Sequence, residues 1–548
     1  MPHTHCIRIT ELRLPLEHPP EALPEAIAAM LGRFAAQPLN YTVFRRSYDA
    51  RGKSSQILFS YIVDVVVTDR AAALAHFAGN KQISPTPDMR YHFVGHANAI
   101  SAQKKRPVVV GFGPCGIFAA LILSQMGLRP LVLERGQSVR QRTQDTWDLW
   151  RKKTLHPESN VQFGEGGAGT FSDGKLYSQV KDPHFYGRKV LEEFVKAGAP
   201  EEILYVSRPH IGTFRLVSMV EKMRAEMLSL GAEIRFGARV EKLVIEKGQI
   251  KGVLLQDGEL IESEHVVLAL GHSARDTFEQ LCDQGVFMEP KPFAVGFRIE
   301  HPQSLIDRAR FGKYAGHPLL GAADYKLVHH AKNGRAVYSF CMCPGGTVVA
   351  ATSEPGRVVT NGMSQYSRAE RNANSGIVVN IKPEDYSNTP GVPPALAGIA
   401  FQRFWESRAF ELGGEDYCAP AQLVGDFVRD VPSTALGQVQ PSYKPGVRLG
   451  SLSNALPGFA IEAIREALPA FDRQIKGYYL EDAVLTGVET RTSSPLRITR
   501  GDDFQSLNVR GLFPAGEGAG YAGGILSAGI DGIRVAQALG QSLLSVDI

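Results

Sequence analysis

The stretch that decides the fold is Val108-Val109-Val110-Gly111-Phe112-Gly113-Pro114-Cys115-Gly116. Its three valines predict a buried strand, and the apolar run Ile117 to Met126 that follows them predicts a helix. The glycines between strand and helix fit the pattern G-x-G-x-x-G, which also arises by chance, as it does at Gly164 to Gly169. Here, however, Leu131-Val132-Leu133 predicts a second buried strand that ends in Glu134, about 20 residues beyond the glycines. This context predicts a Rossmann-like dinucleotide site.

Each residue type in this stretch has a physical role. Gly111 permits the tight turn, Gly113 lets the backbone approach a pyrophosphate, and Gly116 lets the helix pack closely on the strand. The helix N-terminus offers free N–H groups and a positive dipole end to the phosphates. Glu134 is expected to accept hydrogen bonds from ribose hydroxyls. The predicted cofactor contacts in this half of the site are Gly111, Gly113, Pro114, Gly116, Glu134 and Arg135.

A second glycine-rich segment, Gly516-Glu517-Gly518-Ala519-Gly520, follows the apolar Leu512-Phe513 hundreds of residues later. A domain that binds only NAD does not need such a distant second loop, whereas FAD is long enough to extend from the first site to another. Glu517 would hold a ribityl hydroxyl. The backbone of Gly523, Gly524 and Ile525 would donate to the pyrimidine edge of the flavin, where reduction builds negative charge. The sequence therefore predicts FAD as the cofactor.

Length and composition limit the class of protein. The chain has 548 residues, of which 44% are hydrophobic and 21% charged, and its formal net charge is +4. These values are typical of a globular protein of several domains and do not indicate a nucleic-acid-binding protein as a whole. No apolar run is long enough to span a bilayer, and the first residues do not resemble a secretory signal. With six scattered cysteines, we expect a cytoplasmic protein without a membrane partner.

The order of the predicted elements divides the chain into an α/β protein with inserted parts. Residues 1–100 read as a small α+β domain with a ferredoxin-like β-α-β-β order. Residues 104–289 and 482–548 alternate strands and helices and would form the two parts of the FAD-binding domain. Residues 290–481 are rich in Pro, Gly and strand-like runs, and we expect them to form a β-rich substrate or cap domain.

The N-terminal domain carries the excess of basic residues. Its clusters Arg45-Arg46, Arg51-Gly52-Lys53 and Lys104-Lys105-Arg106 leave open an alternative function, an RNA- or protein-binding module with FAD as sensor or scaffold. No RNA-recognition aromatic pattern accompanies them, and solvated surface is the commoner explanation of such clusters.

Several motifs together resemble a known family, the uncharacterised FAD-dependent dehydrogenases of the two-dinucleotide-binding flavoprotein superfamily. The resemblance implies a fold like that of p-hydroxybenzoate hydroxylase or fumarate reductase flavoproteins, bound FAD and redox chemistry. The segments that carry it are Val108 to Gly116, Asn160 to Leu176, Arg208 to Phe214, Ser339 to Gly346, Glu489 to Pro495 and Leu512 to Ile533.

The same resemblance implies further cofactor contacts. The loop with Gly166, Gly167, Ser172, Asp173 and Gly174 would pass close to the flavin. The backbone at Val240 matches the position that meets the adenine in related proteins. Leu268-Ala269-Leu270-Gly271 corresponds to an alanine-threonine-glycine strand end. Leu270 replaces the threonine there, so that position has no hydroxyl, and Gly271 keeps the glycine.

Asp173, Lys175, His210 and Arg491 are the polar residues of the strongest motifs and are the candidate catalytic residues. Arg208 or Arg491 would clamp an anionic substrate, and His210 would shuttle the proton that accompanies hydride transfer. For each residue taken alone, a structural role is the commoner one, and a histidine or an arginine in such a position more often satisfies local backbone carbonyls.

Cys341-x-Cys343 could bring two thiols to one face of a strand. It lacks the helix-start setting that lowers thiol pKa values in C-x-x-C proteins, which favours a packing role. No second C-x-x-C or histidine pair completes a metal site. A complete second nucleotide-binding unit is also missing from the sequence, so a pyridine nucleotide would bind only transiently.

The sequence favours an FAD-dependent oxidoreductase, a dehydrogenase or reductase. It would transfer hydride between flavin and a small-molecule substrate, in a cleft between the FAD domain and residues 290–481. A flavin monooxygenase has the same fold and is the alternative enzyme.

Overall fold

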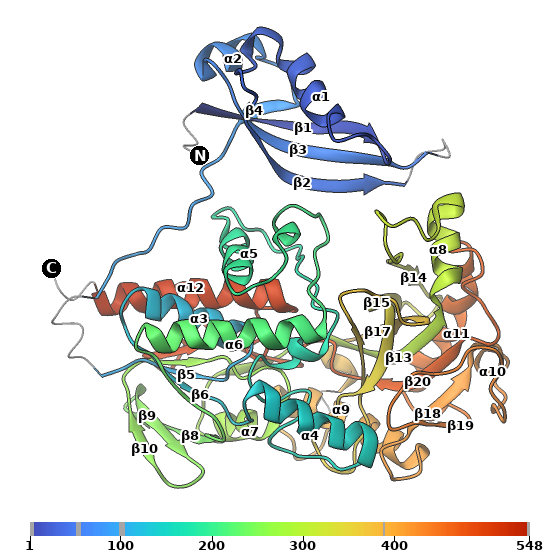
Figure 1. The fold of residues 1–548 in the computed structure, drawn as a ribbon. Helices are drawn as coiled ribbons and strands as arrows, with labels where there is room; N and C mark the ends of the chain where they lie inside the picture. Colours follow the sequence, from blue (N-terminus) through green and yellow to red (C-terminus); the bar gives the residue numbers. More distant parts are fainter. Residues whose placement is uncertain (1–4, 51–55, 98–104, 387–388, 545–548) are drawn as a thin grey trace.

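The structure is a computed structural model that describes residues 5–50, 56–97, 105–386 and 389–544 (Figure 1). The basic cluster Arg51-Gly52-Lys53 lies outside the described residues, as does Lys104. Within the described residues the chain has a mixed α/β fold, as predicted. No helix among these residues is long and apolar enough to span a membrane.

The N-terminal unit is an antiparallel sheet with two helices (Figure 1). The strands pair in the order β2-β3-β1-β4, and β3 alternates between buried and half-buried side chains, as a strand covered on one face does. The β-α-β-β order of the sequence prediction is present and continues into a short helix capped by Asp69 and a three-residue strand. The elements are β1 (Cys6–Pro15), α1 (Ala22–Leu31), β2 (Tyr41–Asp49), β3 (Leu58–Val66), α2 (Arg70–His76) and β4 (Ile83–Pro85).

The edge strand β2 docks this unit onto the rest of the chain. The Arg46 N–H donates to the Tyr205 carbonyl at 2.6 Å, and the Ser207 N–H donates to the Arg46 carbonyl at 2.9 Å. The Arg46 guanidinium lies 5.4 Å from the centre of the Tyr205 ring, and Tyr48 packs edge-on against Phe311. Arg46, which belongs to one of the basic clusters, is therefore engaged within the protein.

The FAD-binding part predicted from the sequence is built on a five-stranded parallel sheet in the order β22-β11-β5-β6-β7. Its strands are β5 (Val108–Val110), β6 (Leu131–Leu133), β7 (Glu233–Arg235), β11 (Val266–Leu268) and β22 (Leu512–Pro514). The strand from the C-terminal segment pairs beside β11, which brings the two distant glycine-rich segments to one edge of the sheet. A small antiparallel sheet follows, formed by β8 (Val240–Glu246), β9 (Gln249–Leu255) and β10 (Leu260–Glu262).

Helices pack on this parallel sheet. Helix α3 (Pro114–Gln125) packs along α12 (Ile525–Leu544), and the two run side by side in Figure 1. Helix α3 begins at Pro114, three residues before the predicted start, because proline suits the first helical position. The remaining helices are α4 (Val139–Lys152), α5 (Tyr186–Lys196), α6 (Thr213–Ser229) and α7 (Arg275–Asp283).

An eight-stranded sheet forms the core of the β-rich domain, with the order β14-β15-β17-β13-β20-β18-β19 and β16 paired to β15. The predicted domain end at residue 481 falls before β20 (Val484–Glu489), which lies inside this sheet between β13 and β18. Sequence reasoning missed this return because the pairing is long-range. The other strands are β13 (Phe293–Pro302), β14 (Val328–His330), β15 (Ala336–Ala350), β16 (Thr360–Ser364), β17 (Asn372–Ile381), β18 (Ala419–Leu423) and β19 (Val447–Leu449).

Within the described residues, four helices complete this domain, and a two-stranded ribbon joins it to the first domain. Strands β12 (Met288–Pro290) and β21 (Leu496–Ile498) pair antiparallel where the chain passes between the two domains. The helices are α8 (Gln303–Phe311), α9 (Pro394–Leu412), α10 (Val424–Arg429) and α11 (Gly458–Asp472).

Candidate active site

A cavity of about 1160 Å³ lies between the two domains. It is lined by the ends of β5, β6 and β11, by the start of α12, and by β15 and β20 of the β-rich domain. Typical ligand sites reach about 1,000 Å³, so this cavity has room for an extended ligand and a second, smaller molecule. It also lies beyond the carboxyl ends of parallel strands, where α/β folds bind ligands.

The glycines of the first motif differ in what they do. Gly111 has φ 98°, and a Cβ there would overlap the carbonyl oxygen of Ala269. A Cβ on Gly116 would overlap the carbonyl oxygen of Gly111, so Gly116 serves the packing of α3 and does not line the cavity. Gly113 lines the cavity at the N-cap of α3, and a Cβ there would come no closer than 3.5 Å to Gly167. The chain itself does not require glycine at position 113, which fits a cradle that a ligand fills.

Glu134 lines the cavity at the end of β6, as the sequence predicts, and is almost fully buried. Its carboxylate accepts the N–H groups of Phe112 and Gly136, both at 2.8 Å, and of Gly164 at 2.9 Å. A carboxylate has about four acceptor sites, so these bonds hold Glu134 in place and leave capacity for a hydroxyl donor. Arg135, beside it, is paired with Glu158 and Asp276.

Val240 lines the cavity together with Ala238 and Arg239. Gly523, Gly524 and Ile525, at the start of α12, line it as well. A Cβ on Gly523 or Gly524 would meet nothing within 4 Å, so this helix start is open to the cavity. The first N–H groups of both α3 and α12 thus face one cavity, and both helix ends favour negative charge.

Three of the glycines predicted to contact the cofactor do not line the cavity and instead pack closely against other parts of the chain. They are Gly116, Gly166 and Gly516. A Cβ on Gly166 would overlap the Thr170 hydroxyl. The Gly516 N–H donates to Asp531 at 2.7 Å, and a Cβ there would meet Cys115. Gly167, Gly174 and Gly271, which are also predicted cofactor contacts, line the cavity.

Glu517 lines the cavity beside His272, a residue that sequence reasoning missed although it directly follows Gly271. The Glu517 carboxylate lies 4.0 Å from the His272 ring nitrogen, and the side chains are 26% and 11% exposed. Burial raises the pKa of Glu517 to about 7. Burial and the nearby Arg491 lower the pKa of His272 to about 3, so this ring is neutral at physiological pH.

Asp173 and Lys175 form an ion pair at the cavity wall, with 3.1 Å between Oδ2 and Nζ. Arg368 adds a second cation, donating to the Asp173 carboxylate from Nε at 3.0 Å and from Nη2 at 2.5 Å. Burial works against the charge on Asp173, but Lys175 and Arg368 outweigh it and hold its pKa well below the usual range. Burial likewise opposes the charge on Lys175, and Asp173 outweighs it, so the pKa of Lys175 is raised. Both groups are therefore charged. Ser172, also predicted, lines the cavity beside them.

His210 does not line the cavity. Its Nε2 lies 3.0 Å from the Tyr366 carbonyl oxygen, and its ring stacks on that of Tyr366. The backbones at Lys175 and His210 pair in an antiparallel bridge, and the cavity lies on the Lys175 side. Burial and Arg368 lower the pKa of His210. Arg208 is paired with Asp324 at 2.7 Å and does not line the cavity either.

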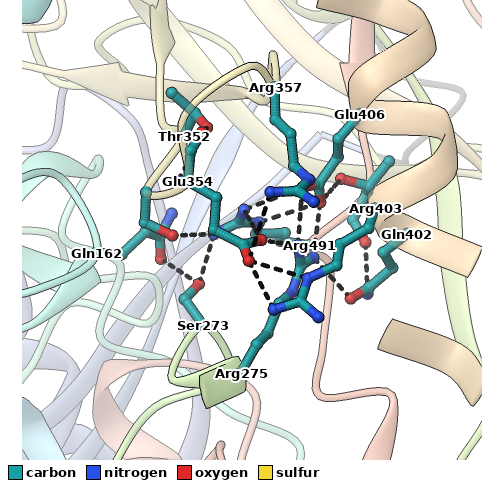
Figure 2. A network of polar contacts seen from close by, with 12 residues as sticks. Gln162, Ser273, Arg275, Thr352, Glu354, Arg357, Gln402, Arg403, Glu406 and Arg491 are labelled. Atoms are coloured by element: carbon teal, nitrogen blue, oxygen red, sulfur yellow. Dashed lines mark hydrogen bonds and ion pairs between the residues drawn. The ribbon is translucent and has the colours of Figure 1, made fainter. Parts of the chain in front are cut away.

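Arg491 lines the cavity from a buried network that joins the two domains (Figure 2). Its Nη2 donates to Glu406 at 3.0 Å, and its Nη1 donates to the hydroxyls of Ser273 and Ser353 at 3.0 and 2.7 Å. Most of its donors are therefore used within the protein, so a substrate clamp would have to displace one of these bonds.

Cys341 and Cys343 are both free thiols on β15. Cys341 lines the cavity, whereas Cys343 is fully buried. The Cys343 thiol donates to the Cys341 carbonyl oxygen, with 3.3 Å between Sγ and O.

Comparison with known proteins matches two sequence models of families to the chain. Residues 292–492 match the sequence model of a family described as FAD-dependent protein, C-terminal domain-like. Residues 6–66 match a domain of unknown function. Over 178 residues the chain is 25% identical to thiamine thiazole synthase of Methanococcus vannielii, covering 30% of this chain and 56% of that protein.

L-proline dehydrogenase from P. horikoshii matches 80% of this chain and 94% of its own, with 14% identity and a TM-score of 0.32, too distant to indicate a function. A protein of Clostridium beijerinckii with no assigned activity is 46% identical over 537 residues, which cover 97% of this chain and 98% of that protein. The chain therefore belongs to the same family as the Clostridium beijerinckii protein, a family of FAD-dependent oxidoreductases, and its cofactor is FAD.

Proposed function

We propose that the protein is an FAD-dependent dehydrogenase or reductase that transfers hydride between the flavin and a small or medium-sized organic substrate. The observation that carries this proposal is the extent of the cavity. It continues from the phosphate cradle at Gly113 to polar and aromatic side chains of the β-rich domain, among them Tyr338 and Asn361. A site for the nucleotide alone would not need that second wall.

The residues of the first domain would hold the cofactor. Gly113 and the start of α3 would take the pyrophosphate, and Glu134 would accept a ribose hydroxyl with its remaining acceptor capacity. Val240 would meet the adenine, and Glu517 would hold a ribityl hydroxyl. The open start of α12 would face the pyrimidine edge of the ring. FAD supplies a group that accepts or releases hydride, and these contacts fix its position.

The substrate would lie against the β-rich wall. Lys175 keeps its proton because Asp173 raises its pKa, so it suits an electrostatic role toward an anionic substrate better than that of an acid. Tyr177, Tyr338 and Phe340 line the same region and would exclude water from the reacting atoms. We propose these residues as the substrate contacts in place of His210, which lies away from the cavity.

The test is anaerobic reduction of the purified yellow protein by NADH, NADPH and a panel of metabolites. Flavin absorbance is the measurement that monitors the reduction. Bleaching by one of them, with the oxidised product identified, would support the proposal. Substrate-dependent NAD(P)H oxidation that yields a hydroxylated product would indicate a flavin monooxygenase. If the flavin stays bound and no compound reduces it, the dehydrogenase proposal is wrong.

A further inference from the structure

Cys341 lies at an irregular point of β15. Phe340 pairs with Gly376 of β17 and Cys343 pairs with Asn374, so β15 has one more residue than its partner over this stretch. The extra residue makes a β-bulge, a feature that redirects side chains and is common beside active sites. Cys341 has φ 44°, in the left-handed region that few residues other than glycine adopt. Strain of this kind at a cavity wall points to a functional requirement.

The two cysteines differ in a way that suits an attacking and a resolving thiol. Cys341 lines the cavity, and Cys343 is buried behind it with its Sγ 3.3 Å from the Cys341 carbonyl oxygen. The neighbouring Cys343 thiol, together with Lys175 and Arg298, lowers the pKa of Cys341 against the effect of burial. The neighbouring Cys341 thiol and burial raise the pKa of Cys343. The reactive thiolate is thus the sulfur that faces the cavity.

Cys341 lines the same cavity as Glu517, the proposed ribityl contact, and Lys175 at the substrate wall. Its backbone is fixed by Arg298, whose Nη1 donates to the Cys341 carbonyl at 2.8 Å. The Lys175 ammonium donates to the carbonyl of the next residue, Met342.

We propose that Cys341 and Cys343 are a redox-active pair that exchanges electrons with the flavin, which makes the substrate class a disulfide or a dithiol. This inference rests on the proposed oxidoreductase function. When the pair is oxidised, the S–H bond of Cys343 breaks and its proton leaves, one S–S bond forms between the Cys341 thiolate and the Cys343 sulfur, and an electron pair passes to oxidised flavin. In reverse, the disulfide takes an electron pair from flavin reduced by a pyridine nucleotide, and one proton returns to Cys343, which leaves Cys341 as the thiolate. The Cys341 thiolate then attacks a substrate disulfide and forms a mixed disulfide, which releases one substrate thiol. Cys343 attacks the Cys341 sulfur of this mixed disulfide, which re-forms the Cys341–Cys343 disulfide and releases the second substrate thiol.

The test is a reductive titration of the FAD-loaded full chain after mild oxidation with diamide. The wild-type protein should take up one electron pair for the flavin and a second one for the disulfide. Cys341→Ser and Cys343→Ser should each take up only the electron pair of the flavin. Cys282→Ser, on α7, is the matched control and should behave as wild type. Flavin absorbance and circular dichroism of each variant report whether it folds and binds FAD.

Thiol labelling and peptide mass of the same oxidised samples give a second measurement. The peptide that contains both cysteines should lose two hydrogens and resist labelling in the wild type. Electron uptake equal to that of the variants, with both thiols still labelled, would overturn the proposal. That result would not contradict the proposed oxidoreductase function, because other substrates could still reduce the flavin. If no compound reduces the flavin, the proposed function is contradicted even when the disulfide forms.

Discussion

Arg275 and Glu406 form a bidentate ion pair in the interior, with Nη1 to Oε2 at 2.8 Å and Nη2 to Oε1 at 2.7 Å. Arg275 begins α7 of the first domain, and Glu406 lies on α9 of the second. Arg491 binds the same carboxylate, so one buried group holds two arginines, of which Arg491 lines the cavity (Figure 2). Burial alone would raise the pKa of Glu406, but the two arginines outweigh it and hold the pKa far below its usual range.

Glu406→Gln should therefore be strongly destabilising. Removing one partner of a buried ion pair leaves uncompensated charge and costs about 3–5 kcal/mol. The measurement is the free energy of unfolding in urea at neutral pH. Glu411→Gln is the control, because Glu411 is 53% exposed in its pair with Arg408 and should change stability by no more than about 0.5 kcal/mol. Equal stability of the two variants would contradict this role of Glu406.

The pH dependence of the same variants follows from the direction of the pKa shift. A carboxylate whose pKa is lowered in the folded state contributes stability that is full above its unfolded value, about 4.3, and lost as pH falls below it. The difference in unfolding free energy between wild type and Glu406→Gln should thus shrink on acidification below about pH 4. A difference that stays constant down to pH 3 would show that the ion pair is not its source.

The parallel sheet and the cofactor end of the site could be predicted because they depend on local patterns. The valines at 108–110, the glycines after them and Glu134 lie within one unit, and the structure places Gly113, Glu134 and Val240 on one cavity. The domain boundary at residue 481 was wrong because β20 pairs with β13, almost 200 residues earlier, and no local pattern encodes that pairing.

The four candidate catalytic residues do not all line the cavity, and long-range packing is again the reason. Asp173, Lys175 and Arg491 line the cavity, and His210 does not, although all four lie in strong motifs. Which side of the backbone a side chain takes depends on long-range packing, here on Tyr366. Cys341 seemed to lie on a regular strand in the sequence, and its bulge is set by the register of β15 against β17.

Two of the three glycines of the first motif, Gly113 and Gly116, should give different phenotypes when each is replaced by alanine. Gly116→Ala forces a Cβ into the Gly111 carbonyl oxygen and should destabilise the fold by about 1–3 kcal/mol or more. Gly113→Ala fits the chain and should fold normally but bind FAD at least about tenfold more weakly, because its methyl group occupies the cradle. The measurements are the thermal midpoint of the apoprotein and an FAD titration.

The control for both is Gly458→Ala at the start of α11, where a Cβ would meet nothing within 4 Å. It should change neither quantity. Normal FAD affinity in Gly113→Ala would contradict the assignment of the phosphate cradle.

The basic N-terminal domain offers a test of the binding-module alternative. Arg46 is held by Tyr205 and Ser207 within the chain, whereas Arg45 is exposed. We expect the full chain to show no salt-dependent affinity for single-stranded RNA in fluorescence anisotropy, since specific contacts would need a free basic surface. Binding that weakens with salt and is lost in Arg45→Glu would contradict this expectation.

Glu517 should make the stability of the apoprotein depend on pH near neutrality. Its pKa is raised to about 7, so the neutral form favours folding. That contribution is full below the unfolded pKa of about 4.3, falls as pH rises toward 7, and is absent above it. Glu517→Gln stays neutral at every pH. It should match the wild type at pH 4 and exceed its stability at pH 8 by at most about 3 kcal/mol, reduced by water in the cavity.

The measurement is the unfolding free energy of both apoproteins at several pH values between 4 and 8. The control is Glu462→Gln, on α11 and away from the cavity, which should follow the wild-type curve. Asp531→Asn would not serve, because Asp531 is buried in an ion pair with Arg500. A pH profile of Glu517→Gln parallel to that of the wild type would show that Glu517 is already ionised below neutrality. Its carboxylate would then meet the ribityl chain as an acceptor only, with no proton to donate.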